Sequence, residues 1–179
     1  LVYESMQAAD QANVAYQQAL KVDSRHIYTL SALANIESRL GNSKAAQDYF
    51  KKILAIKPNH LNALMALAQL SERDGDAKAL AGWLIKARDR NPDSSIPVNF
   101  LVNHYLQTGQ LDKASSEANS FYLNNKNKVF ALILMARTSL ARQDDEAARS
   151  FLERVIQANP KDEVYRLQLA NLLIRMKEF

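Results

Sequence analysis

The sequence predicts an all-α protein, a solenoid of stacked antiparallel helix pairs, and three observations predict it. Three of the four glycines recur at one spacing of 34 residues: Gly41, Gly75 and Gly109. Three of the four prolines are separated by 34 and then by 68 residues: Pro58, Pro92 and Pro160. Between these residues, apolar side chains recur every three or four positions, which is the periodicity of a helix. A fixed period of this length is typical of a helical-repeat protein.

The period divides the chain into a single array of consecutive segments. A partial unit over 1–26 is followed by full units over 27–60, 61–94, 95–128 and 129–162, and a partial unit over 163–179 ends the chain. In each full unit the helical pattern occurs twice, as the first unit shows with Leu30, Leu33 and Ala34 and then Ala46, Phe50 and Ile53. Each full unit is therefore predicted to be a helix–turn–helix.

The residues between the helices predict where each helix ends. The glycine ends the first helix, because a helix C-terminus often needs a positive φ. Asn42, Asp76 and Asp144 follow at the next position of the repeat and are predicted N-caps of the second helix. The proline follows the second helix, where its missing N–H stops further winding. In two units another residue replaces the expected one: Lys126 stands in place of a proline and Gln143 in place of a glycine.

The partial units continue the pattern at both ends. Ala12 and Tyr16 mark the second helix of the leading unit, and Leu169 and Ala170 mark the first helix of the trailing unit. The apolar trailing helix has no following partner helix in the sequence, whereas solenoids usually end in polar caps. We therefore expect a piece of a longer array, and a homodimer through the uncapped C-terminal end.

Composition excludes several classes of protein. Hydrophobic residues make up 47% of the chain and cysteine is absent, so neither a disordered tail nor a disulfide scaffold is predicted. The formal net charge of +4 is spread along the chain without a block of like charges, so no nucleic-acid partner is predicted. The longest apolar run, 129–136, is too short to span a membrane, so no transmembrane segment is predicted.

The repeated unit resembles the tetratricopeptide repeat family. That family has a small residue at position 8 of the repeat, an alanine at 20, an aromatic residue at 24 and a proline at 32. Three units supply these positions as follows: Ala34, Ala46, Phe50 and Pro58; Ala68, Leu80, Leu84 and Pro92; Ala136, Ala148, Leu152 and Pro160. In the third full unit Val102 replaces the small residue at position 8. The resemblance implies a right-handed superhelix that acts as a non-catalytic protein-interaction scaffold and binds a peptide or protein segment in a concave groove lined by the first helices.

The same resemblance implies which residues line the groove. The family's ligands lie along positions 2, 5, 9, 12 and 13 of the first helices, and position 9 is polar in every unit of this chain. The predicted groove residues are Asn35, Arg39, Gln69, Arg73, Asn99, Asn103, Phe130, Ile133, Arg137, Asn171 and Arg175. The hypothesis places the centre of the site at Asn103 and Arg137, whose side chains can donate to a peptide backbone or to a carboxylate. The alternative is that this polar series faces water and binds nothing.

Other functions were weighed against this one. Residues 67–94 and 100–115 look like the bacterial tetratricopeptide-repeat lipoproteins associated with PEP-CTERM sorting and exopolysaccharide export, which implies a place outside the inner membrane and a polysaccharide as an alternative partner. RNA-binding helical repeats read bases near the start of each first helix, where this chain has Ile96, Phe130 and Val164. The family's clamp for chaperone C-termini is missing, because Ala66 and Phe100 stand where it needs polar residues.

The sequence predicts no enzyme, no cofactor and no metal site. It has no cysteine nucleophile, no HExxH motif and no glycine-rich phosphate loop. The three histidines are interpreted as exposed or capping residues: His26, His60 and His104. The adjacent Asp144 and Asp145 stand at a helix start, where capping accounts for them.

Overall fold

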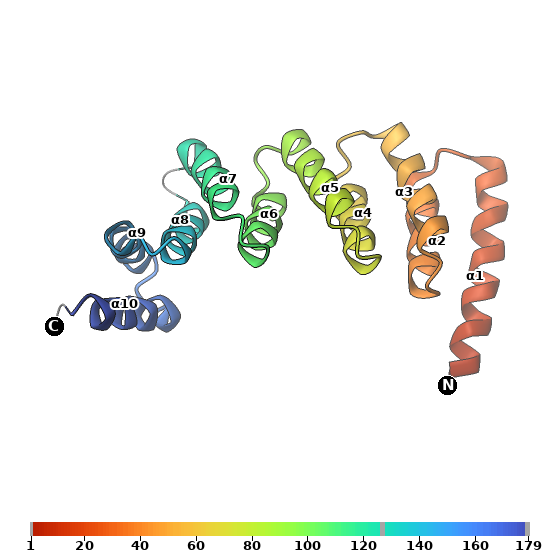
Figure 1. Ribbon diagram of the computed structural model, residues 1–179. Coiled ribbons are helices and arrows are strands. Elements are labelled where there is room, and N and C mark those ends of the chain that lie inside the picture. The colour runs from red at the N-terminus through yellow and green to blue at the C-terminus, as the bar shows by residue number, and fades with distance from the viewer. Residues whose placement is uncertain (1, 126–127, 178–179) are drawn as a thin grey trace. The chain divides into compact units, whose positions relative to one another are not determined.

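A computed structural model describes residues 2–125 and 128–177, and side chains from residue 11 onward. Over these residues the chain consists of α-helices joined by short turns (Figure 1). The helices are α1 (Val2–Val22), α2 (Ile27–Arg39), α3 (Ser43–Ile56), α4 (Leu61–Arg73), α5 (Ala77–Arg90), α6 (Ser95–Gln107), α7 (Leu111–Asn124), α8 (Val129–Ala141), α9 (Asp145–Ala158) and α10 (Glu163–Met176). The prediction of an all-α repeat fold is confirmed. Lys126, which was predicted to replace a proline, lies outside the described residues.

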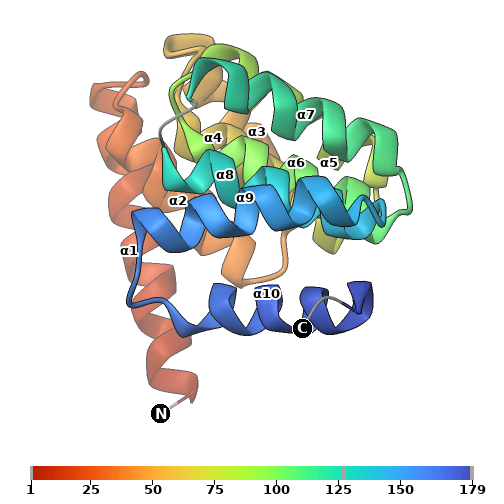
Figure 2. The same ribbon diagram turned by 90° about the vertical axis from the view of Figure 1, so that its left-hand side faces the viewer.

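The chain divides into two compact units, residues 1–92 and 93–179. In the first unit each helix packs against the next, from α1 to α5. In the second unit consecutive helices from α6 to α10 also pack against each other, and the first helices α6 and α8 touch directly. Figure 2 shows α9 beside α8, with α10 next to α9. Because neighbouring helices share their apolar faces, each helix pair is stabilised by the pair beside it.

The turn between the two helices of a pair has the same backbone conformation with and without glycine. Gly75, after α4, has a φ of +74°, and Gln143, after α8, has a φ of +59°. A Cβ placed on Gly75 would meet no atom within 4 Å, so the cost of a side chain there comes from the backbone conformation alone. An L residue in this left-handed region costs about 1 kcal/mol relative to glycine. The repeat therefore imposes this turn even on a residue that disfavours it.

We expect Gln143→Gly to raise the free energy of unfolding by about 1 kcal/mol, because glycine removes the left-handed strain at this turn. The matched control is Gln18→Gly within α1, where glycine lowers helix stability by about 1 kcal/mol. Urea unfolding followed by circular dichroism measures both variants. Equal destabilisation by the two changes would contradict the strain at Gln143.

Two of the three predicted N-caps are confirmed. The Asp76 carboxylate accepts from the backbone N–H of Ala79 at 2.8 Å, and the Asp144 carboxylate accepts from that of Ala147 at 3.2 Å. The prediction for Asn42 was wrong: its side-chain amide donates to the carboxylate of Glu37 at 2.8 Å and makes no cap bond to α3. The acidic side chain five residues earlier competes for the amide of Asn42, and the cap position keeps only its backbone role.

The core of each unit is built on small residues where helices cross. Ala46 and Ala148, at the same position of the repeat, are both fully buried. In the first unit one buried cluster joins α2, α3 and α4: Leu30, Ala34, Ala46, Phe50, Ile53, Ala63, Leu67 and Leu70. In the second unit a smaller cluster joins α8, α9 and α10: Ala136, Ala148, Leu152 and Leu172. These clusters hold the first helices in place and so position the residues of the candidate site.

Candidate functional site

Three of the predicted groove residues meet in the second unit. Asn99 and Asn103 lie one helical turn apart on α6, so their side chains share one face of that helix. From α8, Arg137 donates one Nη1–H to the Oδ1 of Asn99 at 3.1 Å and one Nη2–H to the Oδ1 of Asn103. All three side chains are half-buried. We call this set the Arg137 cluster.

Tyr165 of α10 adds a third helix to the surroundings of Arg137. Burial raises the pKa of the Tyr165 phenol, the charge of Asp162 raises it further, and the charge of Arg137 lowers it. Sequence analysis missed Tyr165, since it considered only positions 2, 5, 9, 12 and 13 of each first helix.

The remaining predicted residues of the second unit have different surroundings. Phe130 packs edge-to-face against Phe121 of α7, with ring centroids 6.2 Å apart, so it contributes to packing between helices. Ile133 is half-buried and Asn171 is exposed. Arg175 pairs with the carboxylate of Asp145 on α9, and its Nε donates to Oδ2 at 3.2 Å. Arg175 therefore ties α10 to α9 and is not part of the Arg137 cluster.

In the first unit, three predicted residues line one hollow between α2 and α4. Its volume is about 310 Å³, and its lining is Asn35, Ser38, Phe50, Ala66, Gln69, Leu70, Glu72 and Arg73. Arg73 donates from Nη1 to the backbone carbonyl of Ser38 at 2.8 Å, which fixes its side chain across the two helices. Arg39 lies outside this lining, and its Nε donates to the carbonyl of Asn35 in its own helix at 3.4 Å.

Two of the histidines that were considered as metal ligands form hydrogen bonds at the starts of helices. The imidazole of His60 accepts from the backbone N–H of Ala63 at 3.2 Å and so caps α4. Burial lowers the pKa of His60 and the charge of Lys57 lowers it further, while a backbone hydrogen bond raises it. A lowered pKa favours the neutral imidazole, which is the form whose Nδ1 can accept a hydrogen bond. His26 pairs with the hydroxyl of Thr29 at 2.7 Å. Within the described part of the chain, no three His, Cys, Asp or Glu side chains are grouped so as to hold a metal ion.

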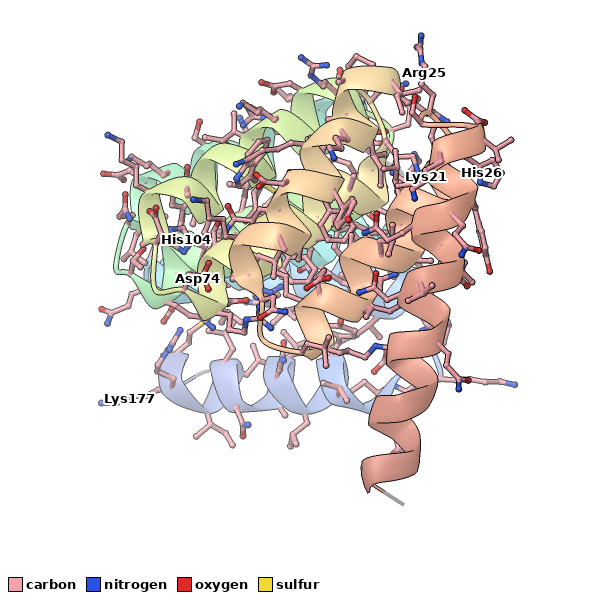
Figure 3. The ribbon with its side chains drawn as sticks, turned by 90° about the vertical axis from the view of Figure 1, so that its right-hand side faces the viewer. Lys21, Arg25, His26, Asp74, His104 and Lys177 are labelled. Atoms are coloured by element: carbon pink, nitrogen blue, oxygen red, sulfur yellow. The ribbon has the colours of Figure 1, made fainter. Side chains whose placement is uncertain are left out.

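Figure 3 shows the side chains around the turn between α1 and α2. Lys21 and His26 lie at this end of α1, and Arg25 points outward. Asp74, at the end of α4, accepts from the hydroxyl of Ser43 at 2.6 Å and from the amide of Gln47 at 3.1 Å. These contacts link α4 to the start of α3 and involve none of the predicted groove residues.

The comparisons with known proteins identify the repeat. A family model described as "Tetratricopeptide repeat" matches residues 27–60. No curated protein matches the sequence. Among the helices of the described residues, none combines the length and the apolar character that crossing a membrane requires.

Several solved structures share the fold over nearly the whole chain. A tetratricopeptide repeat protein from Parabacteroides merdae matches with a TM-score of 0.68 and 16% identity, over 98% of this chain and 70% of that one. YrrB, described as a TPR protein with an unusual peptide-binding site, matches with a TM-score of 0.60 and 18% identity, over 99% of this chain and 88% of that one. Pseudomonas aeruginosa pilF matches with a TM-score of 0.65 and 19% identity, over 99% and 81%.

At these identities the solved structures establish the fold, while the family model identifies one repeat, over residues 27–60. The narrower resemblance to exopolysaccharide-associated lipoproteins gains no support from the comparisons and stays a prediction. The chain therefore carries one segment, residues 27–60, that matches the tetratricopeptide repeat model, and its helix pairs are arranged as in solved tetratricopeptide repeat structures.

Proposed function

We propose that the chain is a protein-interaction scaffold that binds an extended peptide segment on the first-helix face of its second unit. The observation that carries the proposal is the Arg137 cluster, in which two asparagine side chains from α6 hold the guanidinium of Arg137. A surface arginine normally samples many rotamers, and fixing one of them on binding costs free energy. Here the two asparagines already fix the rotamer of Arg137, so its guanidinium can donate to a ligand without that cost.

The cluster has the chemistry to bind a peptide backbone or a carboxylate. Two of the five N–H donors of Arg137 are used by the asparagine oxygens, and the others remain for a ligand. Because each asparagine accepts through Oδ1, its amide N–H groups also face away from that bond and can donate. A guanidinium paired with a carboxylate or with carbonyl oxygens makes charge-assisted hydrogen bonds, which are stronger than neutral ones.

Apolar side chains of α6 and α10 are also exposed in this unit. Four residues at positions 2, 5 or 12 of these helices are at least half exposed: Ile96 at 50%, Val164 at 60%, Leu167 at 63% and Ile174 at 58%. Exposed apolar side chains in the same unit suit a peptide whose backbone and acidic groups meet Arg137 while its apolar side chains pack against α6 or α10. That YrrB has the same fold and a described peptide-binding site supports the choice of a peptide as ligand.

The test compares Asn103→Ala, Arg137→Gln with the wild-type chain. Peptides are first selected on the wild-type protein from a random display library, and their Kd values are then measured by calorimetry. We expect the double variant to weaken binding at least about tenfold, since a hydrogen bond to a charged group contributes about 1.5–3 kcal/mol. Helicity and Tm measured by circular dichroism show whether both proteins are equally folded.

The matched control is Asn119→Ala, Arg142→Gln, which removes the same residue types from the same unit at positions that are not among the predicted groove residues. Asn119 is exposed on α7, and the ion pair of Arg142 with Asp112 lies at the surface and contributes little. The control should bind the selected peptides with unchanged Kd. Equal binding by the wild-type chain and the Arg137 double variant would refute the proposal.

A further inference from the structure

A second hollow of the first unit lies on the side of the second helices. Its volume is about 370 Å³, and it is lined by Lys51, Leu54 and Ala55 of α3, Pro58, Leu64 of α4, and Trp83, Lys86 and Arg90 of α5. None of the predicted groove residues belongs to this lining. We call it the Trp83 hollow.

The floor of the Trp83 hollow is apolar. Leu54 and Trp83 are half-buried and pack against the buried cluster of α2, α3 and α4. Leu64 beneath them is buried. The floor is therefore anchored in the core, and its shape is set by packing rather than by flexible surface side chains.

The rim of the hollow is positively charged. Lys51, Lys86 and Arg90 all line it, and no carboxylate of the described residues does. The ammonium of Lys86 lies 4.3 Å from the centroid of the Trp83 ring, in a cation–π contact. Lys86 and Arg90 are one turn apart on α5, where like charges repel each other. The chain thus gathers three cations around one apolar recess with no anion of its own to balance them there.

We propose that the Trp83 hollow binds an acidic peptide segment that places one apolar side chain in the recess and carboxylates against the three cations. The volume lies at the small end of the range for ligand sites, about 300–1,000 Å³, which fits a side-chain anchor. Unpaired cations around an apolar recess are complementary to acidic residues that flank an apolar one. This site does not depend on the Arg137 cluster, because it lies in the other unit and uses other residues.

The shape of the hollow favours a peptide over a lipid surface or a nucleic acid. Insertion into a membrane requires apolar side chains that protrude, whereas Trp83 and Leu54 line a recess and are half-buried. Stacking with a base requires an open aromatic face, whereas Lys86 lies over the ring of Trp83. An apolar side chain of a peptide needs neither a protruding anchor nor an open aromatic face, because it can fill the recess itself.

Trp83 is the one tryptophan of the sequence, so its fluorescence reports on this hollow alone. The probe is a short peptide of alternating glutamate and leucine, and two further peptides replace either the glutamates by lysine or the leucines by glycine. We expect a saturable change in Trp83 emission with the first peptide, weakened by salt, and no saturable change with the other two. Calorimetry on the same peptides gives the Kd independently of the fluorophore.

The variant Lys51→Gln, Lys86→Gln, Arg90→Gln should weaken binding of the acidic peptide at least about tenfold. The matched control, Arg25→Gln, Lys44→Gln, Lys78→Gln, removes three exposed cations of the same unit that do not line the hollow, and it should bind unchanged. The Asn103→Ala, Arg137→Gln variant should also bind unchanged, which separates this site from the proposed function.

Three results would overturn the proposal. The first is the absence of a saturable signal with the acidic peptide. The second is equal weakening by the control variant, which would mean that net charge alone attracts the peptide. The third is tighter binding to phosphatidylserine vesicles than to the peptide, lost in the variant of the hollow, which would assign this face to a membrane.

Discussion

Leu67→Ala is expected to lower the free energy of unfolding of the first unit by about 2–5 kcal/mol. Leu67 has no exposed surface and lies in the buried cluster that joins α2, α3 and α4. Truncation removes apolar atoms from the place where three helices meet, and a fixed backbone leaves a cavity there. A domain of ordinary stability has only about 5–15 kcal/mol to lose, so this change removes a large part of it.

Urea unfolding followed by circular dichroism measures the loss, and Leu123→Ala is the matched control. Leu123 lies on α7 and is 55% exposed, so the same truncation there should change the free energy of unfolding by less than about 0.5 kcal/mol. If both variants unfold at the same urea concentration, the cluster does not carry the stability assigned to it.

Ala46→Leu should destabilise the chain by about 1–3 kcal/mol through overpacking. Ala46 is fully buried on α3 and belongs to the same cluster as Leu67, where a small side chain lets the helices approach closely. Leucine has nearly the helix propensity of alanine, so the effect arises from packing and not from the backbone.

Ala15→Leu controls for the chemical change. Ala15 is exposed on α1, so the larger side chain meets solvent and stability should stay within about 0.5 kcal/mol of the wild type. Thermal unfolding measures both variants. If the Ala46→Leu protein is more stable than the wild type, the helices around Ala46 are not packed as closely as the prediction requires.

The two proposed sites use different physical means to bind a peptide. In the second unit, side chains of one helix hold the arginine of another in place before any ligand arrives. In the first unit, the Trp83 hollow combines an apolar floor with cations that have no carboxylate beside them. The two proposed sites share no residue, so variants of one leave the residues of the other unchanged.

Much of the fold was predictable because the same helix-ending and apolar residues recur in each repeat of the sequence. Gly75 and Pro92 recur with one period, and the helices between them follow from apolar spacing. Asp76 and Asp144 cap helices as predicted, since a cap depends only on residues within one turn. Asn42 failed as a cap because a nearby glutamate offered its amide another partner.

The sites were less predictable, because they depend on which side chains meet across helices. The sequence by itself determined the helix–turn–helix repeat, the turns and the side of each first helix on which Asn103 and Arg137 lie. Only the tertiary structure decided that Arg137 bonds to Asn99 and Asn103, residues 38 and 34 positions away. It also decided that Arg175 pairs with Asp145 instead of joining them. Local propensity acts within a turn or two of helix, whereas hydrogen bonds and hollows form between residues that only packing brings together.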